Sequence, residues 1–322
     1  MGLKKILALG LTTVLAVGTL TGCGKKDASD NKVKKVSIIQ YVQHPALDGA
    51  REGFLAGLKE AGFTEGENLE VKYENASAEM ATAGTIAETF ANEGQDLILA
   101  IATPAAQAVA QKIKDTPILV TAVTDPADAG LVESNEKVGG NVSGTSDLSP
   151  VKEQIRMIKK VKPDAQKVGV VFCSAEDNSK LLAGLAEEEI KAQGMEYMEF
   201  TVQNSNDVQS VMESMAGKVD AIYAPTDNVI SQSMSTVSEI AIRNKLPLIA
   251  GEEEQVKNGA LCTKGINYFN LGKQTAAMAV KILNGEKKVE ELPIEYQENL
   301  SIEVNEETAK AIGIENIKDL IK

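Results

Sequence analysis

Polar side chains that can hold a small charged molecule follow several short apolar segments of this 322-residue sequence. Hydroxyls and the free N–H groups at helix starts bind carboxylates, whereas carboxylate side chains bind ammonium groups. We therefore expect a binding site for a small zwitterion, built from two groups of residues. The earlier group is His44, Thr103, Thr121, Thr124 and Asp125, and the later group is Ser174, Asn178, Thr226, Asp227 and Glu252.

Several of these residues also have a purely structural interpretation. Thr103 precedes a proline and can simply cap its own helix, and Asp125 precedes a proline in a pattern typical of a turn. Glu252 belongs to a run of three glutamates, which is commonly just a solvated surface. Asp227 is also a common capping residue, but the matching helix start in the other half of the chain carries the uncharged Pro104. This difference favours Asp227 as the partner of a ligand ammonium.

Most catalytic and metal chemistry is disfavoured by what the sequence lacks. His44 is the only histidine, there are three cysteines and no C-x-x-C pair, and neither G-x-G-x-x-G nor a P-loop follows the first predicted strand. We therefore predict no catalytic residue, no metal, no cofactor and no enzyme activity. Cys173 and Cys262 lie at the ends of predicted strands, and two buried thiols or a disulfide are both compatible with that placement.

Short β-rich apolar segments alternate with helical ones from residue 36 onward, which predicts parallel sheets covered by helices on both faces. The predicted strands are residues 36–42, 69–75, 97–102, 118–123, 141–145, 167–173, 197–202, 221–225, 246–250 and 260–266. The predicted helices are residues 46–61, 81–92, 105–114, 150–161, 178–193, 208–216, 229–244 and 271–284.

A weak internal repeat divides this pattern in two. Gly62 and Thr103 in the first half correspond to Gly194 and Thr226 in the second. We therefore predict an α/β fold of two doubly wound parallel-sheet lobes joined by three crossover segments, with a ligand cleft between the strand ends and a hinge at the crossovers. Lobe 1 is expected to comprise residues 36–145 plus 257–292, and lobe 2 residues 146–256 plus 293–322.

The N-terminus has the features of a lipoprotein signal peptide. Lys4 and Lys5 precede an uncharged apolar segment that ends in Leu20-Thr-Gly-Cys23. We expect cleavage after residue 22, a lipid anchor on Cys23, and a flexible tether over residues 23–35. Removing residues 1–22 takes away two positive charges and changes the net charge from −13 to −15. This acidity disfavours nucleic acid as a partner.

The motifs together resemble the ABC transporter substrate-binding proteins of the tryptophan/tyrosine type. The similarity rests on His44-Pro-Ala-Leu-Asp48, Leu99-Ala-Ile-Ala-Thr-Pro104, Thr121-Ala-Val-Thr-Asp-Pro126, Tyr223-Ala-Pro-Thr-Asp-Asn228 and Lys264-Gly-Ile. It spans essentially the whole chain after the signal segment. The resemblance implies a type I periplasmic-binding-protein fold. It also implies ligand contacts at His44, Thr103, Thr124, Asp125, Asn178 and Asp227.

The resemblance further implies a function and partners. We expect an extracytoplasmic lipoprotein that captures an amino acid, often an aromatic one, and delivers it to an ABC permease and ATPase. A ligand-sensing receptor subunit of the same fold is the alternative, and an enzyme acting in the cleft is a second alternative. Neither the ligand's exact identity nor the choice between transport and sensing follows from the sequence.

Overall fold

The computed structural model describes residues 33–322, which form one compact unit. The predicted signal peptide over residues 1–22 and the predicted lipidation site Cys23 lie outside the described residues. The tether was expected to end at residue 35, but the first strand already begins at Lys34. Within residues 33–322, no helix combines the length and apolar character that a membrane span requires.

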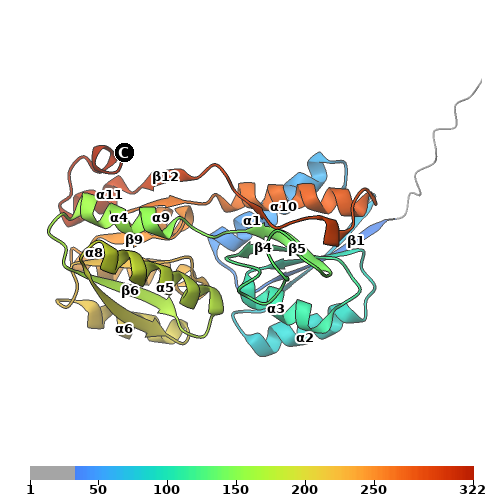
Figure 1. Ribbon diagram of the computed structural model, residues 1–322, viewed down its shortest axis with the longest axis horizontal. Helices are drawn as coiled ribbons and strands as arrows, with labels where there is room; N and C mark the ends of the chain where they lie inside the picture. Colours follow the sequence, from blue (N-terminus) through green and yellow to red (C-terminus); the bar gives the residue numbers. More distant parts are fainter. Residues whose placement is uncertain (1–32) are drawn as a thin grey trace, which may run out of the picture. The chain divides into compact units, whose positions relative to one another are not determined.

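The described chain contains two six-stranded sheets, each with helices on both faces, as predicted (Figure 1). All pairs in the first sheet are parallel. Its strands, in spatial order, are β11 (Glu295–Tyr296), β5 (Val142–Ser146), β4 (Ile118–Val123), β3 (Leu97–Ile101), β1 (Lys34–Gln40) and β2 (Leu69–Asn75). The central strands β3 and β4 are buried at every position, as expected for parallel strands covered on both sides.

The second sheet repeats this order and ends in one antiparallel strand. Its strands are β12 (Ser301–Val304), β10 (Cys262–Gly265), β9 (Leu248–Ala250), β8 (Ala221–Ala224), β6 (Lys167–Cys173) and β7 (Glu196–Val202). The equivalent positions of β1 and β6, and of β3 and β8, confirm the two-lobe repeat that the sequence predicted.

Helices pack in pairs on each sheet face (Figure 1). In the first lobe, one face carries α1 (Pro45–Glu60) and α10 (Tyr268–Leu283), and the other carries α2 (Met80–Ala91) and α3 (Thr103–Lys112). In the second lobe the pairs are α4 (Val151–Val161) with α5 (Asp177–Ala192), and α6 (Val208–Met215) with α8 (Met234–Arg243). The short helices are α7 (Asn228–Gln232), α9 (Glu253–Lys257), α11 (Glu306–Ile312), α12 (Ile317–Leu320) and the 3-10 turns 205–207 and 289–291.

Glycines let α1 and α10 approach closely. A Cβ atom on Gly272 would lie 2.0 Å from the carbonyl oxygen of Ala50, and one on Gly53 would lie within 2 Å of the carbonyl oxygen of Phe269. The α10 helix follows the second crossover, so this packing fixes the returning chain on the first lobe.

Three segments connect the lobes, as predicted, but two of the crossings lie later in the chain than expected. The segments are residues 147–150, 266–267 and 297–300. Residues 260–266 were assigned to lobe 1, yet β10 pairs with β9 and β12 in the second sheet. Similarly, β11 pairs with β5 in the first sheet, although residues from 293 onward were assigned to lobe 2. The repeat explains the first difference, because β10 occupies in sheet two the position that β5 occupies in sheet one.

Candidate functional site

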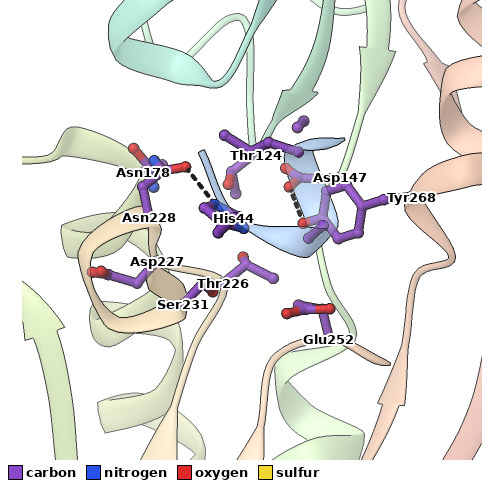
Figure 2. Close-up of a pocket in the computed structure, with 13 residues that line it drawn as sticks. His44, Thr124, Asp147, Asn178, Thr226, Asp227, Asn228, Ser231, Glu252 and Tyr268 are labelled. Atoms are coloured by element: carbon purple, nitrogen blue, oxygen red, sulfur yellow. Dashed lines mark hydrogen bonds between the residues drawn. The ribbon is translucent and has the colours of Figure 1, made fainter. Parts of the chain in front are cut away.

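A small, largely enclosed pocket lies between the two lobes at the carboxyl ends of the strands (Figure 2). Both lobes contribute to it. The lining residues are His44, Ala46, Leu47, Ala122, Thr124, Asp147, Asn178, Thr226, Asp227, Asn228, Ser231, Glu252 and Tyr268.

The backbone at the strand ends of the first lobe is strained. Ala122 has φ +55° and Ala102 has φ +80°, a region that side-chain-bearing residues rarely adopt. The pairing of β4 with β5 also shifts register between Val120 and Val123. Together these features bend the end of β4 and bring Ala122 and Thr124 to the pocket. Such strain is typically retained where it shapes a functional site.

His44 joins the lobes across the pocket. It precedes α1, and its Nε2 lies 3.5 Å from Oδ1 of Asn228, at the start of α7 (Figure 2). Burial lowers the pKa of His44 to about 4, so the imidazole is neutral at pH 7. A second interlobe hydrogen bond runs from Nε2 of Gln107 to Oδ2 of Asp177, at 3.2 Å. The cleft is therefore closed over the pocket.

Asp227 lines the pocket, but its carboxylate is bound to backbone. Oδ1 accepts a hydrogen bond from the N–H of Ile230 at 2.8 Å, which caps α7. Oδ2 accepts one from the N–H of Cys173 at 2.6 Å, at the end of β6. Burial raises the pKa of Asp227. Its two oxygens thus fix the local backbone of the second lobe, which is the capping interpretation of this residue.

Glu176 forms a buried polar cluster beside Asp227. Its Oε2 accepts hydrogen bonds from the side-chain amides of Asn228 at 2.5 Å and Asn178 at 3.4 Å. Burial first, and the negative charge of Asp227 second, raise the pKa of Glu176 to about 8. Because both amide groups donate to Glu176, their oxygens face away from it. Oδ1 of Asn228 faces His44, and Oδ1 of Asn178 has no hydrogen-bond partner in the protein.

A second acidic cluster lies on the other side of the pocket (Figure 2). The hydroxyl of Tyr268 donates to Oδ2 of Asp147 at 2.5 Å. Glu252 caps α9, with its two oxygens accepting from the N–H groups of Glu254 and Gln255. Burial raises the pKa of Asp147, and it raises that of Glu252 to about 8.

Unpartnered buried polar atoms gather at this cleft. Seven buried side-chain atoms of the described residues have no hydrogen-bond partner. Five of them belong to the pocket or to its Glu176 cluster: His44 Nδ1, Asp147 Oδ1, Glu176 Oε1, Asn178 Oδ1 and Thr226 Oγ1. Buried polar groups are normally paired, so this concentration is typical of a site that binds a polar ligand.

Six of the ten predicted binding residues line the pocket, namely His44, Thr124, Asn178, Thr226, Asp227 and Glu252. The other four lie outside its lining. Thr103 is buried at the first position of α3, and the Thr121 hydroxyl joins a buried chain with those of Thr145 and Thr275. Asp125 Oδ1 accepts from two backbone N–H groups and Asn135, as the turn interpretation requires. Ser174 bonds to residues 202 and 203.

The sequence interpretation missed Asp147, Tyr268, Asn228 and Ser231. Asp147 directly follows β5, so the rule that polar residues at strand ends bind ligand would have identified it had it been applied to that strand. Tyr268 is the first residue of α10 and was not among the predicted contacts. The two cysteines of the described residues, Cys173 and Cys262, are buried free thiols, and burial raises the pKa of each to about 12.

Comparison with known proteins gives consistent results. The family model of ABC transporter substrate binding proteins matches residues 35–322. A tyrosine-binding protein of Clostridioides difficile is 40% identical over 324 residues, which covers 98% of this chain and 94% of that protein. Proteins of this family bind solutes outside the cytoplasm and are not enzymes.

Solved structures agree with this match. An ABC domain from Streptococcus pneumoniae in complex with L-Trp is 31% identical, with a TM-score of 0.85 over 89% of this chain and 97% of that one. The ligand-free, open structure of an adhesive substrate-binding protein from Clostridium difficile is 45% identical, but its TM-score is 0.69 over 88% of this chain and 96% of that one. The arrangement here thus resembles the ligand-bound structure more, although its sequence is the less similar of the two. The chain belongs to the family of ABC transporter substrate-binding proteins.

Proposed function

We propose that this protein captures an L-amino acid whose aromatic side chain carries a hydrogen-bond donor, such as tyrosine or tryptophan, and delivers it to an ABC permease and its ATPase. The observation that carries the proposal is the inventory of unpartnered atoms in the closed cleft. Three of the five, Asp147 Oδ1, His44 Nδ1 and Asn178 Oδ1, are acceptors. A ligand that satisfies them must bring several N–H or O–H donors.

The acceptors are spread across the pocket. Asp147 Oδ1 is at one end, where an α-ammonium with three donors fits. Asn178 is at the other end, and His44 lies between the two, beside Asn228 (Figure 2). His44 Nε2 faces the Asn228 oxygen and therefore carries the proton, which leaves Nδ1 as an acceptor. A phenol O–H or an indole N–H at the far end of the ligand would donate to Nδ1 or to the Asn178 oxygen.

The remaining surface suits the rest of such a ligand. Ala46, Leu47, Ala122 and the Tyr268 ring provide apolar contact for an aromatic group. The hydroxyls of Thr124, Thr226 and Ser231 can donate to the carboxylate, for which the lining offers no lysine or arginine. Two relatives support this chemistry, since one is a tyrosine-binding protein and the other was solved in complex with L-Trp.

The experiment is isothermal titration of the purified, ligand-stripped protein with all L-amino acids. We expect binding of tyrosine or tryptophan, at least about tenfold weaker binding of phenylalanine because it leaves a buried acceptor unpaired, and no binding of alanine. If no amino acid binds across the panel, the proposal is wrong. Equal affinity for tyrosine and phenylalanine, with no binding of tryptophan, would exclude the donor requirement at the far end.

The N-terminus supports a further part of the proposal, that the mature protein begins at a lipidated Cys23 and is tethered to the membrane. The support is the basic start, the apolar segment and the small residues before Cys23. Mass spectrometry of the membrane fraction tests it. We expect an N-terminal peptide that starts at Cys23 and carries a diacylglyceryl group, and we expect Cys23→Ala to abolish this modification. Recovery of an unmodified Cys23 peptide from membranes would contradict the anchor.

A further inference from the structure

We propose that Asp147, positioned by Tyr268 and supported by Glu252, binds the ammonium group of the ligand in this cleft. The inference rests on the proposed function and deepens it, because it names the group that selects for an amine. It replaces the sequence-based assignment of this role to Asp227.

The geometry of Asp147 leaves one oxygen free. The side chain is 4% exposed and lines the pocket, Oδ2 accepts from Tyr268, and Oδ1 has no protein partner. A buried carboxylate with a free oxygen is costly unless a charged donor completes it. An ammonium group supplies the charge and can donate to Oδ1 while its other protons reach neighbouring acceptors.

The other three buried carboxylates in the pocket lining or directly behind it fit this role less well. Asp227 and Glu252 line the pocket, but each has both oxygens bonded to backbone N–H groups. Glu176 has a free oxygen, yet it lies behind Asn178 and Asn228 and is not among the lining residues. Asp147 alone combines a place in the lining with an unpartnered oxygen.

The charge balance points the same way. None of the thirteen lining residues is lysine or arginine. Burial raises the pKa of both Asp147 and Glu252. The groups that oppose this shift are hydroxyls and backbone N–H groups for Asp147, and backbone N–H groups for Glu252, so no cation contributes. Burial first, and the negative charges of Asp147 and Glu252 second, raise the pKa of Tyr268, so both carboxylates lie close to its hydroxyl. The three residues thus form one acidic corner that lacks a cation among residues 33–322.

The position of this corner connects ligand binding to the hinge. Asp147 is the first residue of the crossover 147–150, and Tyr268 directly follows the crossover 266–267. Glu252 belongs to the second lobe, after β9. An ammonium held among them contacts the first connecting segment, the start of α10 and the second lobe at once, so it favours the closed arrangement.

The test compares two ligands on matched variants. One ligand is L-tyrosine, and the other is 3-(4-hydroxyphenyl)propanoate, which lacks only the amine. Asp147→Asn keeps the size of the side chain and an oxygen that can accept from Tyr268. The first control is Asp125→Asn, which lies outside the lining and keeps the single oxygen that its three donors use. The second control is Glu176→Gln, the rival carboxylate.

We expect Asp147→Asn to weaken tyrosine binding roughly 30-fold or more and to leave the affinity for the amine-free acid within about threefold of wild type. Asp125→Asn should change neither affinity. Three results would overturn the assignment: an equal loss for both ligands in Asp147→Asn, no loss for tyrosine, or a selective loss in Glu176→Gln instead. If wild type binds tyrosine in any of these cases, the proposed function stands while the ammonium assignment fails.

A crystal structure of the wild-type protein with bound tyrosine keeps the assignment testable if Asp147→Asn does not fold. We expect the ligand nitrogen within about 3.2 Å of Asp147 Oδ1. A nitrogen placed on Asp227 or Glu176 would refute the assignment.

Discussion

The Tyr268 hydroxyl donates a hydrogen bond to Oδ2 of Asp147, 2.5 Å away, and leaves Oδ1 of that carboxylate unpaired in the pocket. The two residues are 121 positions apart in the sequence: Asp147 begins one connection between the lobes, and Tyr268, the first residue of α10, directly follows another. This bond therefore holds the first connecting segment against the start of α10 and leaves a carboxylate oxygen free to face a ligand.

Tyr268→Phe isolates the contribution of this bond. It removes the hydroxyl and keeps the ring. We expect the free energy of unfolding to fall by about 1–3 kcal/mol, because the buried Asp147 carboxylate loses its only side-chain donor at Oδ2. We also expect tyrosine affinity to fall about tenfold, because Asp147 is no longer oriented. Urea denaturation and calorimetric titration measure the two effects.

The control is Tyr73→Phe. Tyr73 is 40% exposed on β2, so its hydroxyl contributes little. If Tyr268→Phe behaves like Tyr73→Phe in both measurements, the hydrogen bond has no role in the site.

Glu252→Gln should stabilise the ligand-free protein while weakening ligand binding. Burial raises the pKa of Glu252 to about 8, compared with about 4.3 in an unfolded chain. The folded state thus binds a proton more tightly, and the resulting stability is complete below pH ~4 and is lost as pH rises toward 8. Glutamine carries no charge at any of these pH values, and its carbonyl oxygen keeps one of the two hydrogen bonds that cap α9.

Urea denaturation at pH 5 and pH 8 measures this effect. We expect Glu252→Gln to gain at least about 1 kcal/mol over wild type at pH 8 and clearly less at pH 5. A gain of the same size at both pH values would show that the carboxyl does not titrate in this range.

We expect the buried, neutral His44 to make the free energy of unfolding fall in acid. Burial lowers the pKa of His44 to about 4, whereas an unfolded histidine has a pKa near 6.5. The stability linked to the neutral ring is therefore present above pH ~6.5 and is lost as pH falls toward 4. We expect about 2 kcal/mol of this contribution to be missing at pH 5.

His44→Gln tests this, because glutamine can donate to Asn228 but does not titrate. The difference in unfolding free energy between wild type and His44→Gln should change by that amount between pH 7.5 and pH 5, in the direction that disfavours wild type in acid. A pH-independent difference would mean that the ring is charged or exposed in the folded protein.

Much of the fold could be predicted from sequence, because its causes are local. All ten predicted strands occur with small shifts of their ends, since short apolar β-rich segments leave few alternatives in an α/β chain. The predicted helix over residues 229–244 is divided at Ser233 into α7 and α8. The two short strands β11 and β12 were missed, because their residues are exposed or half-buried and carry little apolar pattern.

The site could be predicted only in part, because side-chain direction at a strand end depends on backbone torsions that the sequence pattern does not reveal. Ala102, with φ +80°, precedes Thr103, which lies outside the pocket lining, whereas the strained end of β4 brings Thr124 into it. The pairing of Asp147 with Tyr268 depends on where the chain crosses between lobes. That crossing was expected before β10 and occurs after it.

The close contact between α1 and α10 supports Tyr268, which is the first residue of α10. Gly272 lies where a Cβ atom would come within 2.0 Å of the Ala50 carbonyl oxygen and 2.8 Å of the Phe54 nitrogen. Because both contacts are backbone, Gly272→Ala must push the helices apart. We expect a loss of about 1–3 kcal/mol in the free energy of unfolding, and weaker tyrosine binding, since Tyr268 lies one turn earlier on α10.

Gly84→Ala is the matched control for this change. Gly84 lies inside α2, and a Cβ atom there would meet no other atom within 4 Å. We expect a gain of about 0.5–1 kcal/mol, because alanine restricts the unfolded chain and suits a helix interior, and no change in affinity. Urea denaturation and titration of both variants make the comparison. If Gly272→Ala were as stable as Gly84→Ala, α10 would not need its close approach to α1, and the positioning of Tyr268 would have to come from the crossover segments alone.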